Sequence, residues 1–145
     1  MVRALALVLT FALVGCMTEA PPAPMAQAVP GAATITVTRS SAPYAAIAAA
    51  NVDINGVHSA DLYIGQSYSA SVRPGPTVIT ASMRLYPGRY SVKFNAVAGG
   101  NYHFAIEPRY EVITSGMMLG AVGQAVDYAA NSDDHNGAFK IVQTP

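Results

Sequence analysis

The sequence predicts a mainly β protein, a small antiparallel β-sandwich of about seven strands with one glycine-rich helix near the C-terminus. Two patterns lead to this fold class. Between Ala33 and Pro108 apolar residues recur at every second position, which is typical of strands that bury one face. From Ser115 onward the spacing of apolar residues becomes helical. Glycines, prolines and asparagines separate the short alternating runs, as the turns of a sandwich require.

Residues 1–15 are expected to be a signal peptide. Arg3 is the only charged residue before Cys16, and the apolar run from Ala4 to Gly15 is about a dozen residues long. A membrane-spanning helix needs ~20 apolar residues, so this run is too short to cross a bilayer. A basic start followed by a short apolar core is typical of a secretory signal peptide.

The only cysteine, Cys16, stands directly after this run. Leu13, Val14, Gly15 and Cys16 resemble the lipobox of bacterial lipoproteins. The resemblance implies that the sulfur of Cys16 carries a diacylglycerol, that the signal is cut before it, and that the new amino terminus is acylated, for example with palmitate. An ordinary signal peptide with a chance cysteine is the alternative. Met17 stands where an aspartate commonly signals inner-membrane retention, and the absence of that aspartate resembles the outer-membrane pattern.

Residues 16–32 are expected to form the acylated cysteine and a disordered tether. Residues 17–32 contain four prolines and one charged residue, and they show no apolar periodicity. Such a segment cannot build a core and should be semi-extended, holding a domain up to roughly 50 Å from the bilayer. The folded domain is therefore expected to span residues 33–145, which is enough for one core.

The charge of the mature chain excludes some classes of partner. Loss of Arg3 with the signal leaves seven of the eight basic side chains, against eight acidic ones. Nucleic acid needs a basic face that neutralises phosphates, and anionic lipid needs a polybasic patch. We therefore expect no nucleic acid as a partner and no polybasic membrane patch, and the expected membrane anchor is the lipid on Cys16.

Strands are expected wherever the period of two is clear. The alternating runs are residues 33–39, a hairpin within 52–64 that turns at Asn55-Gly56, and residues 67–72, 77–83, 90–96, 102–106 and 138–142. The clearest pair turns at Gly99 and Gly100, and each of its strands has one apolar face with Lys93 and His103 pointing outward. The residues expected to point into the core are Tyr90, Val92, Phe94, Ala96, Tyr102, Phe104 and Ile106.

A helix is expected over residues 116–130, after Thr114 or Ser115 as the N-cap. Met118, Val122 and Val126 have helical spacing, and residues 116–120 match the close-packing GxxxG pattern. Three interpretations stay open: the helix docks on the sandwich, it lies on a membrane surface or against a partner, or the segment is a glycine-rich loop. The candidate interaction surface consists of Met117, Met118 and Gly120.

Several features follow one another along the chain: the lipobox, the proline-rich tether, the strand "ITVTR", the "DING" hairpin, the "RPGP" turn, the hairpin "FNAVAGGNYHFAIEP", the apolar helix and the terminal "GAFKIV". This order resembles a family of small bacterial lipoproteins with an uncharacterised domain. The resemblance implies a fold similar to the PEGA and carboxypeptidase-regulatory-like sandwiches. It brings no catalytic motif with it.

No residue pattern in the chain indicates a catalytic site, a metal site or a cofactor. His58, His103 and His135 are far apart and lack the short spacing of zinc ligands. Residues 132–143 fail as an EF-hand loop because Ser132 and Gln143 stand where carboxylate ligands are required, so we expect a polar turn there. The serines lack a hydrolase context such as G-x-S-x-G. Three tyrosines fall on core-facing positions rather than on a sugar-stacking platform: Tyr68, Tyr90 and Tyr102.

Together these patterns predict a non-enzymatic lipoprotein of the cell envelope, anchored by the lipid on Cys16 to the periplasmic face of the outer membrane. Its sandwich domain is expected to bind another envelope component such as a protein. The alternative is a module that binds a glycan such as peptidoglycan. An exposed tyrosine row would favour the glycan. An apolar patch that includes Met117 and Met118 would favour a protein or membrane partner, and a cleft in which Ser, His and Asp side chains converge would favour an enzyme.

Replacement of Cys16 by serine tests the anchor. A hydroxyl cannot take the place of the thiol that receives the diacylglycerol, so Cys16→Ser should remain unlipidated and misprocessed and should leave the membrane fraction. Cell fractionation with mass measurement of the protein checks this. A Cys16→Ser variant that fractionates with the membrane in mature form, as the parent does, would show that the lipoprotein interpretation is wrong.

Overall fold

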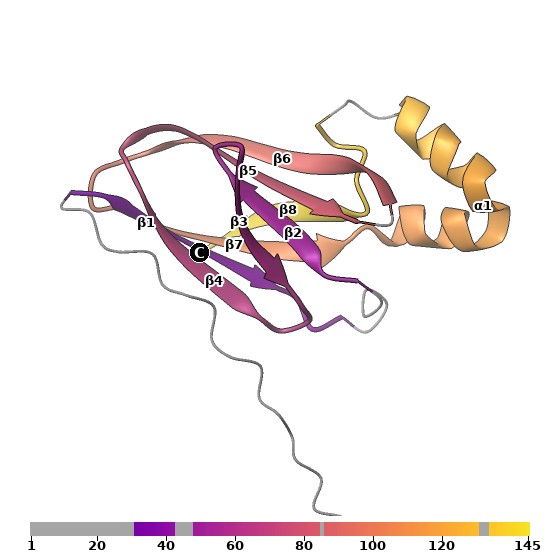
Figure 1. Cartoon of the computed structure of the whole chain (residues 1–145), viewed down its shortest axis with the longest axis horizontal. Coiled ribbons are helices and arrows are strands. Elements are labelled where there is room, and N and C mark those ends of the chain that lie inside the picture. The colour runs from indigo at the N-terminus through magenta and orange to yellow at the C-terminus, as the bar shows by residue number, and fades with distance from the viewer. Residues whose placement is uncertain (1–30, 43–47, 85, 131–133) are drawn as a thin grey trace, which may run out of the picture.

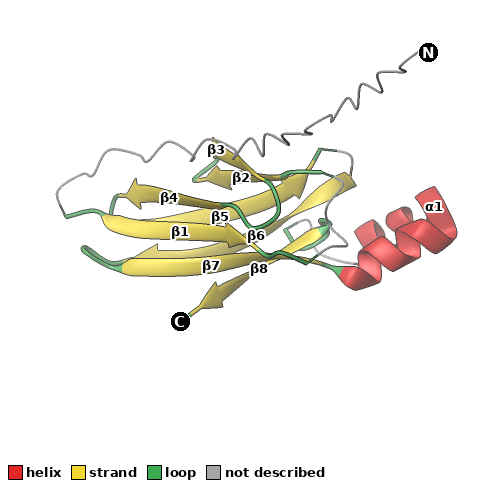
Figure 2. Ribbon diagram, turned by 90° about the horizontal axis from the view of Figure 1, so that it is seen from below, coloured by secondary structure: helices red, strands yellow, loops and turns green. Residues whose placement is uncertain are grey.

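The computed structural model describes residues 31–42, 48–84, 86–130 and 134–145. The expected signal peptide, Cys16 and all but the last two residues of the tether lie outside this part of the chain. The described residues form two four-stranded sheets that pack face to face, with one helix at one end of the sandwich (Figures 1 and 2). The mainly β fold class predicted from the period of two is therefore confirmed.

The first sheet has the strand order β4-β1-β7-β8. Its strands are β1 (Ala33–Arg39), β4 (Ser67–Val72), β7 (Asn101–Pro108) and β8 (Phe139–Thr144). The prediction of a wholly antiparallel sandwich is wrong for one pair, because β1 and β7 run parallel. Tight turns force only consecutive strands to be antiparallel. Five other strands separate β1 from β7 along the chain, so no such turn constrains this pair.

The second sheet has the order β3-β2-β5-β6, and all its neighbours are antiparallel. Its strands are β2 (Ala50–Ile54), β3 (Val57–Leu62), β5 (Gly75–Met83) and β6 (Tyr86–Ala96). The predicted turn between β2 and β3 is confirmed, since Asn55 and Gly56 have positive φ angles of 52° and 76°. The described residues form eight strands rather than about seven. Both strands of the hairpin expected within residues 52–64 are present, as β2 and β3.

The core is built from the alternating residues of both sheets. The inward positions predicted for β6 and β7 are confirmed, because all of them are buried or packed against the buried cluster. Phe104 is 1% exposed, and its ring centroid lies 5.2 Å from that of Phe94 across the two sheets. Lys93 and His103 are exposed, as expected. The hairpin therefore supplies an aromatic contact that joins the sheets.

Arg39 is a charged residue inside the sandwich, at the end where β1 stops. Its side chain is 2% exposed, and its Nη1 donates to the carbonyl oxygens of Ala48 at 2.6 Å and Leu62 at 2.7 Å. The guanidinium also lies over the ring of Phe139, 5.0 Å from its centroid. Burial lowers the pKa of Arg39. Because Leu62 belongs to the second sheet, this side chain ties the two sheets together at one end.

The helix of the described chain, α1 (Tyr110–Ala130), begins earlier than the predicted range 116–130. Thr114 was expected as an N-cap, but its Oγ1 donates to the carbonyl oxygen of Tyr110 at 2.8 Å, so it lies within the helix. Gly120 interrupts α1 with φ 57° and ψ −135°, and Figure 1 shows two helical halves joined by a sharp bend. The bend breaks the continuous ridge that the GxxxG pattern at 116–120 would need.

Truncation of the core aromatic on β7 tests the assigned faces. Phe104→Ala removes a fully buried ring and should lower the free energy of unfolding by about 3 to 5 kcal/mol. His103→Ala, one position along the strand and exposed, should change it little. Denaturant unfolding of the two variants beside the parent measures both effects. Equal and small effects would contradict the packing described above.

Candidate functional site

The start of β1 and the helix α1 lie at opposite ends of the sandwich. β1 begins at Ala33, where the expected tether would join the domain, and runs parallel to β7 with Thr34 beside Asn101 and Arg39 beside Ile106. β7 leads directly into α1, so α1 extends from the end at which β1 stops. Figure 2 shows α1 beyond the end of both sheets. An element at this end is presented away from the point where the chain would be anchored.

The bend at Gly120 folds α1 back on itself. In a straight helix, Asp127 would lie about 27 Å from Arg109, because each residue advances the helix by 1.5 Å. Instead, Nη2 of Arg109 is 3.0 Å from Oδ1 of Asp127. The φ and ψ angles of Gly120 fall in a region that is essentially restricted to glycine. Apart from its chain neighbours and the adjoining helix backbone, no described atom lies within 4 Å of the place where a Cβ would stand. Gly120 is therefore needed for its backbone angle and not for a close contact.

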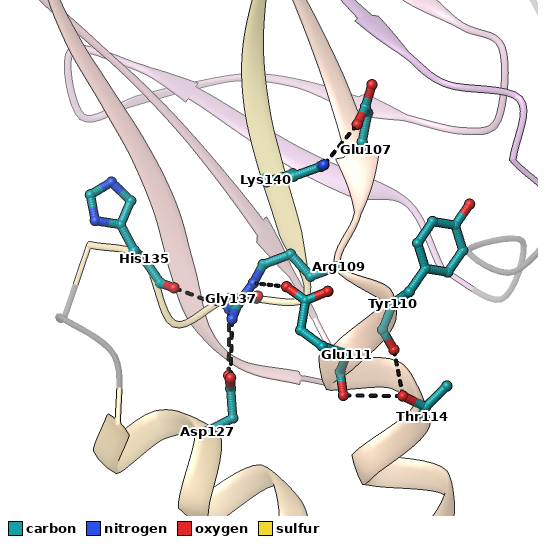
Figure 3. Close-up of polar contacts among 9 residues, drawn as sticks. All are labelled: Glu107, Arg109, Tyr110, Glu111, Thr114, Asp127, His135, Gly137 and Lys140. Atoms are coloured by element: carbon teal, nitrogen blue, oxygen red, sulfur yellow. Dashed lines mark hydrogen bonds and ion pairs between the residues drawn. The ribbon is translucent and has the colours of Figure 1, made fainter.

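Arg109 connects both ends of α1 to the chain that leads into β8. Its Nη1 donates to the carbonyl oxygens of His135 at 3.0 Å and Gly137 at 2.9 Å, while the guanidinium also pairs with Asp127 (Figure 3). The Arg109 and Asp127 side chains are only 8% and 12% exposed. We call Arg109, Asp127 and the carbonyls of His135 and Gly137 the arginine clamp. Removing one partner of a buried ion pair typically costs about 3 to 5 kcal/mol, so the clamp holds α1 firmly.

Two further groups border the arginine clamp. Glu111 lies 3.2 Å from Nε of Arg109, but its side chain is 69% exposed, so this ion pair adds little stability. The hydroxyl of Tyr86, at the start of β6, is buried beside Asp127 without a hydrogen bond of good geometry. Burial, and then the negative charge of Asp127, raise the pKa of Tyr86 while Arg109 lowers it. Tyr86 thus brings the second sheet into contact with the clamp.

The outer part of α1 carries exposed apolar side chains. Met118, Val122 and Val126 are 86%, 67% and 62% exposed, and we call these three residues the apolar tip. Ala125 and Ala129, in the second half of α1, are exposed as well. These exposed residues do not form the contact with the sandwich, which α1 makes through the clamp and through Tyr86 of β6. The glycine-rich loop is wrong, because Tyr110–Ala130 is helical. The helical spacing assumed a straight helix, whereas the bend and the clamp hold a folded-back helix at one end of the sandwich with its apolar tip exposed.

The structure places the candidate interaction residues as follows. Met118 is the most exposed large apolar residue of the described chain. Gly120 is exposed at the bend. Met117 belongs to α1, but its side chain lies outside the described residues, as does Cys16. No helix in residues 31–42, 48–84, 86–130 or 134–145 is long and apolar enough to span a membrane.

The expected polar turn after α1 covers the edge of β6. Ser91 N donates to Asp134 O at 2.7 Å, and Asn136 N and Gly137 N donate to Arg89 O at 3.1 and 3.0 Å. A Cβ on Gly137 would lie 2.8 Å from the backbone of Arg89, so only glycine fits this approach. A hydrogen bond from Lys93, followed by its positive charge, lowers the pKa of Asp134. The sequence indicated the turn but not its pairing with β6.

Polar side chains line two adjoining hollows on the outer face of the second sheet. The hollows measure about 620 and 520 Å³ and share Gly56, Thr80 and Arg89. Cross-strand neighbours from β2, β5 and β6 form the floor, with Asp53 opposite Thr80 and Thr80 opposite Ser91. The hydroxyls of Thr80 and Ser91 bond to each other at 2.9 Å. This face offers short hydroxyls with charges of both signs at its margins.

His58 lies beside these hollows but does not form a catalytic triad with a serine. Its Nδ1 is 3.3 Å from Asp53 and its Nε2 is 3.5 Å from Asp61, so both ring nitrogens face carboxylates. A serine hydroxyl would need one of them as its base. Within the described ranges, no three His, Cys, Asp or Glu side chains converge in a way that could hold a metal ion. That the protein is not an enzyme stays a prediction.

The tyrosines expected in the core, Tyr68, Tyr90 and Tyr102, are confirmed there, since all three are half-buried against the apolar cluster. The exposed tyrosines of the described chain, Tyr63 and Tyr110, belong to different elements and do not form a row along one strand.

No protein-family model matches this chain, and no curated protein matches it.

Proposed function

We propose that the protein is a non-enzymatic lipoprotein of the cell envelope that binds another envelope protein through the apolar tip of α1. The exposure of Met118, Val122 and Val126 on a clamped helix carries this proposal. Large apolar side chains left exposed on one element commonly mark an interaction site. The arginine clamp pre-organises them, because a helix already held in place loses little conformational freedom on binding.

The charge of α1 favours a protein over a lipid surface as the occupant. Helices that lie in a membrane interface are rich in lysine and arginine, which attract anionic headgroups. α1 contains no basic residue from Tyr110 to Ala130, and its two charged residues, Glu111 and Asp127, are acidic. An anionic bilayer would therefore attract this helix poorly, whereas an apolar protein groove needs no such charge.

The position of α1 relative to the tether favours a partner away from the anchoring bilayer. Under this proposal a lipid on Cys16 holds the chain on the periplasmic face of the outer membrane, as the lipobox resemblance implies. Residues 17–32 then separate the lipid from the domain by up to roughly 50 Å. Because Ala33 and α1 lie at opposite ends of the sandwich, the apolar tip is presented outward from the membrane to a second envelope protein.

A glycan such as peptidoglycan is the second candidate ligand, supported by the polar hollows on the second sheet. Hydroxyls such as those of Thr80 and Ser82 suit a polyhydroxylated ligand, and Asp53 and Arg89 add both an acceptor and donors. The described residues that line the hollows include no aromatic ring on which a sugar could stack. We therefore place protein binding by the apolar tip first.

A photo-crosslinking residue at position 122 of the full chain, expressed in intact cells, tests the protein-binding proposal. We expect one defined protein adduct, because Val122 is 67% exposed on the apolar tip. Val97 is a matched control: it is 60% exposed but lies in the β6–β7 turn at the tether end. The same probe at position 97 should not give that adduct. Adding Met118→Asp should remove the adduct from position 122 without changing the melting temperature, since Met118 contributes nothing to the core.

Three outcomes would contradict the proposal. Identical adducts from positions 97 and 122 would show that capture is not specific to the apolar tip. Adducts with lipid alone would identify a membrane surface as the occupant. Adducts with peptidoglycan would establish the second candidate in its place.

A further inference from the structure

The two sheets of the described chain have four edge strands, namely β4 and β8 in the first sheet and β3 and β6 in the second. An edge strand presents a row of N–H and C=O groups that can pair with another strand. Proteins commonly protect such edges with charged residues, prolines, bulges or covering loops. The four edges of this sandwich differ in whether they carry such protection.

Three of the edges are protected. The segment from Asp134 to Gly137 covers β6 with backbone hydrogen bonds. β3 is irregular, since its register with β2 shifts between Val52 and Asp53, and it carries the polar side chains His58 and Asp61. β8 carries Lys140, which pairs with Glu107 at 3.1 Å (Figure 3). Each of these features makes the addition of another strand less favourable.

β4 has none of these features. Ser67–Val72 contains no charged residue and no proline, and all six of its residues pair in unbroken register with β1, from Thr38 opposite Ser67 to Ala33 opposite Val72. Within the described part of the chain, no backbone hydrogen bond reaches β4 from its outer side. In an antiparallel pair, every second residue points its N–H and C=O away from the partner strand. β4 therefore offers a straight, uncharged and open edge.

We infer that this edge pairs antiparallel with β4 of a second copy of the chain, joining the first sheets of two molecules into one eight-stranded sheet. A two-fold axis through Ser69 brings like faces together: the partner's Ser69 lies opposite Ser69, and the partner's Ala70 lies opposite Tyr68. The absence of charge on β4 removes the repulsion that two identical strands would otherwise suffer. Arg73, just beyond the strand, lies about 27 Å from its symmetry mate in this register.

The outer face of the first sheet supports this register. Hydroxyls already bond across β1 and β4, with Thr36 Oγ1 3.0 Å from Ser69 Oγ and Thr38 Oγ1 2.8 Å from Ser67 Oγ. Placing a second β4 beside the first continues this ladder of serines and threonines over the joint, and the apolar side chains stay on the core face. The proline-rich segment 17–30 of the same chain is a poor alternative occupant, because its four prolines lack the N–H groups that a strand must donate.

Disulfide trapping in membranes from cells that express the full chain tests the inference. Directly opposed residues of an antiparallel pair have Cα atoms about 4.5 to 5.5 Å apart, which a disulfide can bridge. Ser69→Cys should therefore yield a covalent dimer on mild oxidation. The parent chain, with Cys16 as its only cysteine, gives the background, and Ser59→Cys on the protected edge β3 is the matched control. Ser59→Cys should not exceed that background.

A second substitution keeps the test specific to the edge. Ser71→Lys adds a charge to β4 and should reduce the Ser69→Cys dimer at least about tenfold while the melting temperature stays unchanged. Four results would overturn the inference: no dimer from Ser69→Cys, equal dimer from Ser59→Cys, a dimer that Ser71→Lys leaves intact, or a disulfide that joins the Ser69→Cys variant to a different protein instead of to a second copy. None of these readouts depends on the apolar tip, so the protein-binding proposal stands or fails separately.

Discussion

The contact between Arg109 and Asp127 decides where α1 points. It can form only because Gly120 turns the helix back, and the bend in turn would have nothing to hold it without the contact. Arg109 also binds the carbonyls of His135 and Gly137, so the same side chain fixes the segment that covers the edge of β6 and leads into β8. Loss of this one guanidinium would therefore release the helix, the covering segment and the start of the last strand together.

The two ends of the sandwich differ, and the clamp holds α1 at one of them. β1 begins at Ala33 beside the turn at Gly99 and Gly100, and the opposite end carries the buried Arg39 and the apolar tip. A free helix would tend to bury Met118, Val122 and Val126 against the nearest apolar surface, since each buried side chain of this size is worth about 1.5 to 3 kcal/mol. The clamp opposes that collapse, and the exposed side chains remain available to a partner.

The sequence predicts the strands and their inward faces well, because both depend on residues that are close together in the chain. Alternation over a few residues, with turns at Asn55-Gly56 and Gly99-Gly100, is sufficient to orient Phe94, Phe104 and their neighbours. Contacts between distant residues were missed: the parallel pairing of β1 with β7, the burial of Arg39, and the ion pair between residues 109 and 127. Gly120 was interpreted as a small residue for close packing, because its backbone angle cannot be deduced from its identity. The polar hollows could not be predicted either, because they form between three strands whose pairing the sequence does not reveal.

Hydrogen exchange in the second half of α1 measures the effect of the clamp most directly. Arg109→Lys keeps the charge but cannot reach Asp127 and two carbonyl oxygens together. The account predicts slow exchange for residues 121–130 in the parent and exchange at least about tenfold faster in Arg109→Lys, with strands β1 to β5 and β7 unchanged. Arg73→Lys, on an exposed arginine at the tether end, should leave residues 121–130 as slow as in the parent. Equal exchange of this segment in the parent and in Arg109→Lys would contradict the account.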